Sequence, residues 1–179
     1  YTAYTGGICG YSDSAVLAYQ NTGNITNPAD GSDSSFGTNY VRAGGICGYF
    51  SGEETAIQKS SNQGEIYGST SGGICGHMEN GVIEDVYNQG NATAGICYEA
   101  NSGTINRVYN TGTAANAILS SGTLASHSVC YYLSSSATTG FPQNDDAIAK
   151  SSENMKTETF AETLGGAFIY LENSYPVFE

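Results

Sequence analysis

The sequence predicts an all-β fold: a parallel β-helix (β-solenoid) of about five to six coils with a small C-terminal helix-plus-strand cap. Three observations predict it: a five-residue motif that recurs, a polar signature that follows the motif, and a composition rich in glycine and tyrosine. A unit this short cannot bury its own apolar face, so it must stack on its neighbours. At 179 residues the chain is long enough for one such domain.

The recurring motif is Gly-Gly-Ile-Cys-Gly. It stands at 6–10, 44–48 and 72–76, with a degenerate copy at 94–97 and a fifth site at 117–119 that keeps only the isoleucine. The interval between motif isoleucines falls from 38 residues (8 to 46) to 28 (46 to 74) and then to 22 (74 to 96, and 96 to 118). The shortest interval is the basic coil, and longer ones carry insertions. These intervals predict a solenoid over 1–133, with units near 6–43, 44–71, 72–93, 94–115 and 116–133.

Stacking should place the motif residues of successive coils above one another in the core. Neighbouring strands lie about 4.8 Å apart, so the cysteines would form a column. We expect a bend at the glycines that lets isoleucine and cysteine both contribute to the core, although alternation alone does not decide which points fully inward. Parallel side chains disfavour disulfides, and a linear column cannot form a tetrahedral zinc site. The predicted core ladder of apolar residues and free thiols is Ile8, Cys9, Ile46, Cys47, Ile74, Cys75, Ile96 and Cys97.

An Asn-x-Gly corner follows four of the motif sites. Asparagine tolerates left-handed backbone angles, and its amide bonds to neighbouring main-chain groups, so stacked corners can form a hydrogen-bonded ladder. The alternative is a polar row that reads a ligand. The predicted corner residues are Asn21, Asn62, Asn88 and Asn110.

The pattern changes beyond residue 133, and 134–179 are expected to form a linker and a C-terminal cap. A helix is predicted near 152–164, because Met155, Phe160 and Leu164 fall on one face and glycine follows them. One or two short edge strands should follow it. Such a cap would cover the apolar surface and unpaired strand edges of a solenoid end.

The charge balance excludes some partners. Seventeen acidic and five basic residues give a net charge of −12, which disfavours binding to nucleic acid and to anionic membranes. The chain lacks a run of about 18 apolar residues, so we expect no membrane insertion. Its first residues run straight into a repeat without a signal peptide, and we interpret the chain as a monomeric module of a longer polypeptide.

Two groups of residues are candidates for binding. Tyr11, Tyr49 and Tyr98 follow the motif and are expected to line up as an aromatic stripe suited to recognition, unless the rings only cover the coil wall. The insertion in the first unit contains Asp30 and Asp33, which offer oxygen ligands to calcium. Their spacing lacks the full EF-hand set, so no cofactor is predicted and calcium is the only metal kept open.

An enzyme is the alternative, since β-helices host polysaccharide lyases and glycosidases that use carboxylates. Lyase chemistry also needs arginine or lysine beside the acids, and Arg42, Arg107 and Lys59 are scattered over different units. The sequence therefore favours a non-catalytic module. A sugar-binding module without catalysis is one form that it could take. The candidate acids are Glu53, Glu54, Glu79, Glu84, Asp85 and Glu99.

The motif, the Asn-x-Gly signatures at 86–91 and 108–112, and the tail segments at 130–133, 154–156 and 175–177 resemble the GLUG-motif repeats of secreted and wall-attached bacterial proteins. The resemblance covers nearly the full length. It implies a parallel β-helix at a bacterial cell surface, acting as a rigid spacer or in adhesion to a host extracellular protein, such as an immunoglobulin, or to a glycan.

Similar repeats also occur upstream of the zinc protease domain of immunoglobulin A-cleaving proteases. That chemistry needs a His-Glu-x-x-His motif, which the two histidines, His77 and His127, do not form. The resemblance therefore implies a non-catalytic chain.

Overall fold

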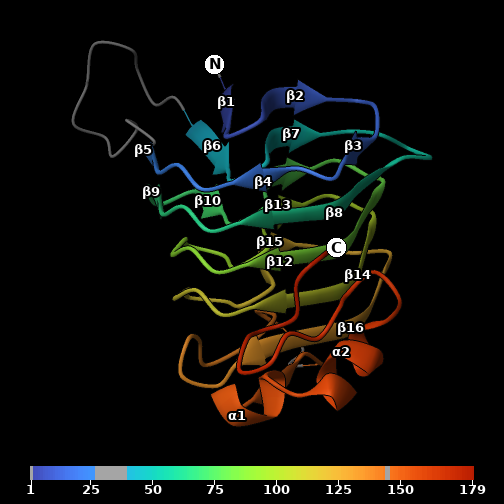
Figure 1. Ribbon diagram of the computed structural model, residues 1–179. Coiled ribbons are helices and arrows are strands. Elements are labelled where there is room, and N and C mark those ends of the chain that lie inside the picture. The colour runs from blue at the N-terminus through green and yellow to red at the C-terminus, as the bar shows by residue number, and fades with distance from the viewer. Residues whose placement is uncertain (1, 27–39, 144–145) are drawn as a thin grey trace.

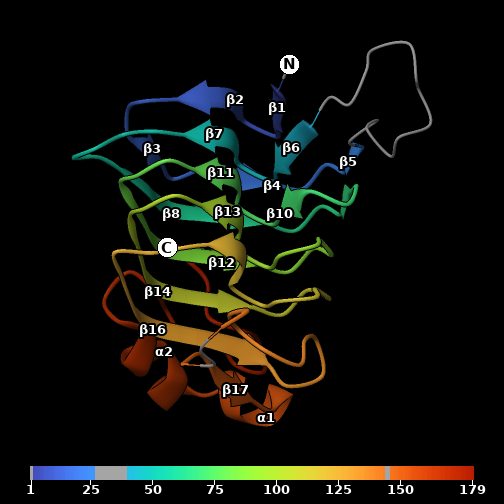
Figure 2. The ribbon, with the colours of Figure 1, turned by 180° about the vertical axis from the view of Figure 1, so that it is seen from behind.

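The computed structural model describes residues 2–26, 40–143 and 146–179. Strands of successive coils pair in parallel and build the walls of a solenoid, with two short helices at its C-terminal end (Figures 1 and 2). The prediction of an all-β parallel β-helix is confirmed. No helix in the described part of the chain is long and apolar enough to cross a membrane.

Four parallel sheets run along the solenoid; sheets B and C extend through most of the coils, whereas sheets A and D contain strands from only a few of them. Sheet A contains β1 (Thr2–Gly6), β6 (Tyr40–Gly44) and β10 (Ser71–Gly72). Sheet B contains β2 (Cys9–Ser12), β7 (Cys47–Phe50), β11 (Cys75–Met78), β13 (Cys97–Ala100) and β15 (Leu119–Gly122). Sheet C contains β3 (Val16–Leu17), β4 (Gln20–Asn21), β8 (Ala56–Asn62), β12 (Val82–Asn88), β14 (Thr104–Asn110), β16 (Ser126–Leu133) and β17 (Ile148–Lys150), and sheet D pairs β5 (Ile25–Thr26) with β9 (Ile66–Tyr67).

The two motif glycines form the bend between sheets A and B. A Cβ added to Gly45 would lie 2.1 Å from the carbonyl oxygen of Gly73, so no side chain fits there. The bend aims two successive residues into the core: Ile46 and Cys47 are both fully buried. Their backbone N–H groups both donate to the carbonyl oxygen of Ile74, at 3.0 Å each.

The first copy of the motif departs from this pattern. Ile8 is 39% exposed, whereas the equivalent Ile46, Ile74 and Ile96 are fully buried. Among the described residues its coil has a neighbour on one side only, so we correct the prediction that Ile8 is a core residue. Cys9, in the same coil, is partly buried.

The motif cysteines lie in register from β2 through β7 and β11 to β13. All five cysteines of the chain are free thiols, and all but Cys9 are buried. Each thiol in the middle of the column donates to the carbonyl oxygen two residues ahead, as Cys75 Sγ does to His77 O at 3.2 Å. The cysteine therefore fills the core and also satisfies a backbone acceptor at the bend.

The corner asparagines form a continuous amide ladder. Asn62 Nδ2 donates to Asn88 Oδ1, and Asn88 Nδ2 donates to Asn110 Oδ1, at 2.8 Å each. Asn21 Nδ2 begins the ladder by donating to Asn62 Oδ1 at 2.7 Å. Each Nδ2 also donates to the carbonyl oxygen of the glycine two residues ahead, as Asn88 does to Gly90.

Sheet C strands bend at a residue that the sequence did not single out. Lys59, Asp85, Arg107 and Val129 all have φ near +50°, in the left-handed region. This bend aims residues three apart into the core, and in β12 both Ile83 and Val86 are fully buried. Strict alternation, the usual signature of a strand, is broken there.

The described residues 134–143 and 146–150 continue the stack, where we expected a linker. Strand β17 pairs with β16, and Thr139 bridges to Asn116 as each motif site bridges to the one before it. Gly140 O accepts from Ile118 N and Leu119 N, as the carbonyl of the motif isoleucine does in the other coils, and the next residue, Phe141, is buried. The sequence analysis missed this copy because only its glycine and an apolar residue remain.

The predicted helix is split in two. Helix α1 (Ser152–Met155) ends before Thr157, whose hydroxyl accepts from Phe160 N at 3.1 Å and caps α2 (Glu158–Leu164). The helix prediction missed this second N-cap. In the rest of the described tail, the expected edge strands reduce to one antiparallel bridge between Ile169 and Val177.

The tail packs along the outer face of sheet C, and the chain ends beside β12 and β14 (Figure 1). Tyr87 and Tyr109 stack at 5.1 Å, and Tyr131 meets Phe160 of α2 edge-on at 5.2 Å. The Tyr109 hydroxyl donates to the carbonyl oxygen of Pro176. This packing creates a second hydrophobic core outside the solenoid, so the cap covers a side of the stack as well as its end.

Candidate functional site

One surface gathers aromatic and charged side chains from four successive coils. It lies where the outer faces of sheets A and B approach each other beside the glycine bends: a Cβ on Gly48 would lie 2.7 Å from Thr5 N, and the rings of Tyr4 and Tyr49 are 4.7 Å apart. We name it the corner surface. Its members are Tyr4, Tyr11, Arg42, Tyr49, His77, Glu79, Glu99 and Asn101.

A row two residues after the motif cysteines forms the centre of the corner surface. Strand register places Tyr11, Tyr49, His77 and Glu99 in this row. The first three rings are stacked: Tyr11 on Tyr49 at 5.4 Å, and Tyr49 on His77 at 5.0 Å with 3° between the planes. Because the rings cover each other's faces, the row offers mainly ring edges, hydroxyls and the exposed Tyr11 to a partner.

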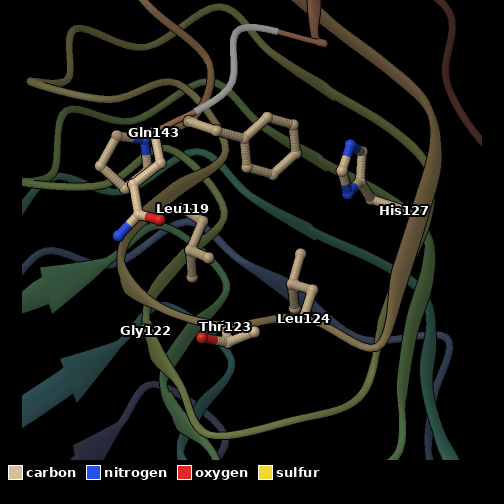
Figure 3. Close-up of a pocket in the computed structure, with 8 residues that line it drawn as sticks. Leu119, Gly122, Thr123, Leu124, His127 and Gln143 are labelled. Atoms are coloured by element: carbon tan, nitrogen blue, oxygen red, sulfur yellow. The ribbon is translucent and has the colours of Figure 1, made fainter.

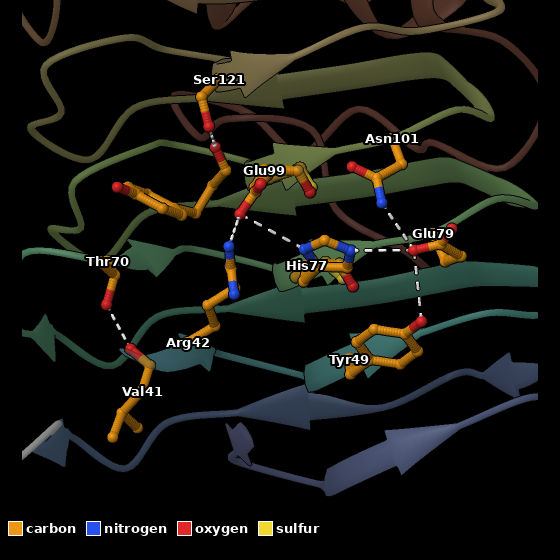
Figure 4. Close-up of polar contacts among 12 residues, drawn as sticks. Val41, Arg42, Tyr49, Thr70, His77, Glu79, Glu99, Asn101 and Ser121 are labelled. Atoms are coloured by element: carbon orange, nitrogen blue, oxygen red, sulfur yellow. Dashed lines mark hydrogen bonds and ion pairs between the residues drawn. The ribbon is translucent and has the colours of Figure 1, made fainter. Parts of the chain in front are cut away.

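Two carboxylates flank the buried His77 ring (Figure 4). His77 Nε2 lies 3.3 Å from Glu79 Oε2, and His77 Nδ1 lies 3.5 Å from Glu99 Oε2. Arg42 forms an ion pair with Glu99 from the sheet A side. The result is a continuous chain of polar contacts from Arg42 through Glu99 and His77 to Glu79, which crosses three coils.

Glu79 is the hub of the outer part of this network. Its Oε2 accepts from Asn101 Nδ2 at 2.7 Å and from the Tyr49 hydroxyl at 3.4 Å. Hydrogen bonds from His77 and Asn101 hold the pKa of Glu79 below its usual range. Burial, and next the charge of Glu79, raises the pKa of Tyr49. At neutral pH Glu79 is therefore an anion, and Tyr49 is a hydroxyl donor.

The predicted aromatic stripe is only partly correct. Tyr98 does not join the row, because the fourth motif copy has tyrosine in place of its last glycine, which puts Tyr98 at the register of Gly76 and Glu99 opposite His77. Counting from the motif cysteine would have found His77 and Glu99. Tyr4 and Arg42 lie outside the motif, and no sequence signal connects them to it.

Asp30 and Asp33, the candidate calcium ligands, lie outside the described residues. Within the described part of the chain, no group of three or more histidine, cysteine, aspartate or glutamate side chains is placed to hold a metal ion.

A second charged cluster lies at the bend of sheet C. Arg107 donates to Asp85 Oδ1 and Glu84 Oε2, at 2.6 Å each, and Gln58 Nε2 donates to Glu84 Oε1 at 2.8 Å. Hydrogen bonding to Asp85 raises the pKa of Arg107 further. We expected the arginines to lie apart from the acids, and this prediction is wrong. Stacking brings residues about one coil apart in the sequence side by side. Arg107 neutralises the charge of the buried Asp85, so a structural role is enough to explain this cluster.

A pocket of about 150 Å³ lies near the C-terminal end of the solenoid (Figure 3). His127 takes the register of the buried Ile105, its ring is 4.4 Å from that of Phe141, and its Nε2 is 3.4 Å from Asp146 Oδ2. The lining residues are Leu119, Gly122, Thr123, Leu124, His127, Phe141, Pro142 and Gln143.

The architecture and the corner surface define a class of protein: a parallel β-solenoid with a polar and aromatic patch on one side. No protein-family model, curated protein or solved structure matches the chain.

Proposed function

We propose that the chain is a non-catalytic recognition module of an extracellular protein at a bacterial cell surface, and that its corner surface binds a host protein or a glycan. The observation that supports this most directly is the charged and aromatic row of Tyr11, Tyr49, His77 and Glu99, completed by Arg42. The resemblance of the repeats to GLUG motifs supports the location and the host partner.

A row that contains partly buried polar and charged side chains costs desolvation free energy, which a purely structural element would avoid. Burying charged groups requires desolvation that their mutual attraction often fails to repay, and apolar residues at such positions are commonly as stable or more so. Other columns of this solenoid repeat one residue type, such as cysteine, isoleucine or asparagine, from coil to coil. His77 is 6% exposed and lies between two carboxylates. Binding a partner is a reason to keep it.

The chemistry of the corner surface fits a polar ligand. Anionic Glu79, the Tyr11 and Tyr49 hydroxyls, and Asn101 offer acceptors and donors within one patch. Sugar hydroxyls and protein side chains use such groups, and tyrosine adds apolar area at low entropic cost. A rigid stack holds these groups in place before binding, which lowers the entropy lost on association.

The test is a binding screen of the purified chain against serum immunoglobulins, extracellular-matrix proteins and a glycan array, with added calcium and with chelator. The variant Tyr11→Ala/Glu79→Gln changes two accessible groups of the corner surface. Tyr67→Ala/Glu65→Gln is the matched control, because it removes another exposed tyrosine and its hydrogen-bonded glutamate.

We expect a saturable hit that the corner variant weakens at least about tenfold, or roughly 1.4 kcal/mol, and that the control leaves unchanged. Equal loss in both variants would reject the corner surface as the binding site. No binding by a folded chain would favour the rigid-spacer function.

A second candidate function is a polysaccharide lyase, and the position of Arg42 beside Glu99 and His77 favours it. Elimination from a uronate needs a cation near its carboxylate, a base for the adjacent proton, and a proton for the glycosidic oxygen that leaves; an arginine can supply the cation, and a histidine can take the proton and pass it to the leaving oxygen. Incubation with acidic polysaccharides, followed by ultraviolet detection of unsaturated ends, tests it. Product that disappears in Arg42→Ala would replace the recognition proposal with an enzymatic one.

A further inference from the structure

Among the described residues, the N-terminal end of the solenoid is an open sheet edge. In sheets A, B and C the first coil supplies the terminal strand: β1, β2 and β3, respectively. Its apolar residues are the least covered of their columns: Ile8 is 39% exposed against 0% for Ile46. The opposite end differs, because β17, α1 and α2 follow the last complete coil there (Figure 2).

The open edge presents hydrogen-bond acceptors at defined positions. Down the stack, the carbonyl oxygen of each motif isoleucine receives N–H groups from the coil before it: Ile46 O accepts from Ile8 N and Cys9 N at 3.1 and 3.0 Å. Ile96 O accepts in the same way from the coil of Ile74. Ile8 O is the equivalent atom of the first coil, and no described residue donates to it.

In the amide ladder, too, each coil donates hydrogen bonds to the coil that follows it. Each corner asparagine uses Nδ2 to donate to the Oδ1 of the asparagine in the next coil, so Oδ1 is the acceptor that faces the preceding coil. Asn21 Oδ1 accepts only from the N–H of Gly23, at 3.2 Å, among the described groups. Asn62 and Asn88 each receive an amide N–H at this position from the asparagine of the preceding coil, and no described residue supplies one to Asn21.

We propose that this end is a docking surface for one further coil of the same repeat, joined in cis ahead of Thr2 and lying parallel on the first coil. The proposal is independent of the corner surface. A coil with the Gly-Gly-Ile-Cys-Gly bend supplies two N–H groups to Ile8 O, and its corner asparagine supplies an amide N–H to Asn21 Oδ1. Its isoleucine and cysteine cover Ile8 and Cys9.

A second copy of the chain fits this end less well. The same end of another molecule presents the same two acceptors, Ile8 O and Asn21 Oδ1, and its described residues offer no matching row of donors. Its other end is occupied by β17 and the helices. In cis, by contrast, a preceding coil runs directly into the first strand, as every other coil of this stack runs into the next.

The test places a copy of residues 44–67 directly ahead of Thr2 in the full chain. The added glycine pair then precedes Gly6 and Gly7 by the interval that separates Gly44 and Gly45 from Gly72 and Gly73. The control carries the same added residues in shuffled order. A third variant has the added coil with its corner asparagine, the copy of Asn62, changed to alanine.

We expect the added coil to slow amide exchange of residues 2–26 at least about tenfold and to raise the thermal midpoint by roughly 5 °C, while the chain stays monomeric in light scattering. The shuffled extension should do neither, and the alanine variant should lose part of the gain. An added coil that protects no better than the shuffled one would overturn the proposal. So would a dimer of the unmodified chain with residues 2–26 already protected.

Discussion

At the scale of single residues, the corner asparagine is the clearest link between sequence and fold. Asn88 is fully buried, its Oδ1 accepts from Asn62, and its Nδ2 donates to both Asn110 and Gly90. Every polar atom of the side chain is thus satisfied, which makes burial of an amide tolerable. The same atoms tie three coils together and close the turn of their own coil.

Replacing Asn88 by alanine should lower the free energy of unfolding by about 3 kcal/mol, because it leaves Gly90 O and Asn110 Oδ1 without their donor in a buried place. Urea unfolding measures the change. Asn106→Ala is the control: Asn106 accepts a hydrogen bond from Ser128 on the surface, and its loss should cost under about 0.5 kcal/mol. Equal losses would contradict a structural role for the ladder.

Cys130 predicts a pH dependence of stability. Burial raises the pKa of its thiol from 9.0 to about 12. Above pH 9 the unfolded chain releases this proton while the folded chain keeps it. The stability from Cys130 is therefore complete below pH 9 and falls by about 1.4 kcal/mol per pH unit between pH 9 and 12.

The measurement is the free energy of unfolding of the wild type and of Cys130→Ala between pH 8 and 11. Tyrosines titrate in the same range in both proteins, so the difference between the two slopes isolates the thiol. Parallel curves would show that Cys130 keeps its ordinary pKa in the folded chain.

At this scale the sequence predicts which residues stack in a column, but it does not predict which residues of different columns are in contact. The isoleucine, cysteine and asparagine columns follow from spacing alone, because the same residue recurs in each coil. The corner surface does not, since its row changes from tyrosine to histidine to glutamate. Arg42 reaches that row from another sheet, and only the folded bend brings them together.

At the scale of elements, the glycine bend can be predicted from the sequence, whereas the packing of the tail cannot. The bend is local, because two glycines remove side chains that would collide with the neighbouring coil, and this is visible in the motif. The tail lies against Tyr87, Tyr109 and Tyr131, which recur at one strand position without indicating what covers them. Local patterns therefore predicted a helix in the tail and missed where the tail packs.

The packing of the tail predicts the effect of Phe168→Ala. Phe168 is buried and its ring lies 5.8 Å from that of Tyr109 and 4.8 Å from that of Phe178. Its loss should cost about 3 kcal/mol of local stability and release residues 165–179. Limited proteolysis should then cut the tail first and leave the coils intact. Leu171→Ala, at a site 47% exposed, should cut at the wild-type rate; identical patterns for both variants would contradict this packing.

At the scale of the whole molecule, the solenoid behaves as a one-dimensional stack. Each coil is stabilised mainly by its neighbours, so a coil with two neighbours is more stable than one with a single neighbour. The middle coils, which contain β11, β12 and β14, have paired strands on both sides and the fully buried Ile74, Ile83 and Ile105. The first coil has one described neighbour and an exposed Ile8.

This arrangement predicts a gradient of local stability along the stack. Amide exchange of the unmodified chain should be fastest in the first coil, residues 2–26, and slowest in β12 and β14, because opening the middle requires breaking two coil interfaces. The same chemical change should also have different costs along the stack. Ile74→Ala should cost about 3 kcal/mol and Ile8→Ala less than about 1 kcal/mol, since Ile8 is already partly exposed. Exchange rates that are uniform along the stack, or equal costs for the two substitutions, would mean that the coils unfold as one cooperative unit whose ends do not fray.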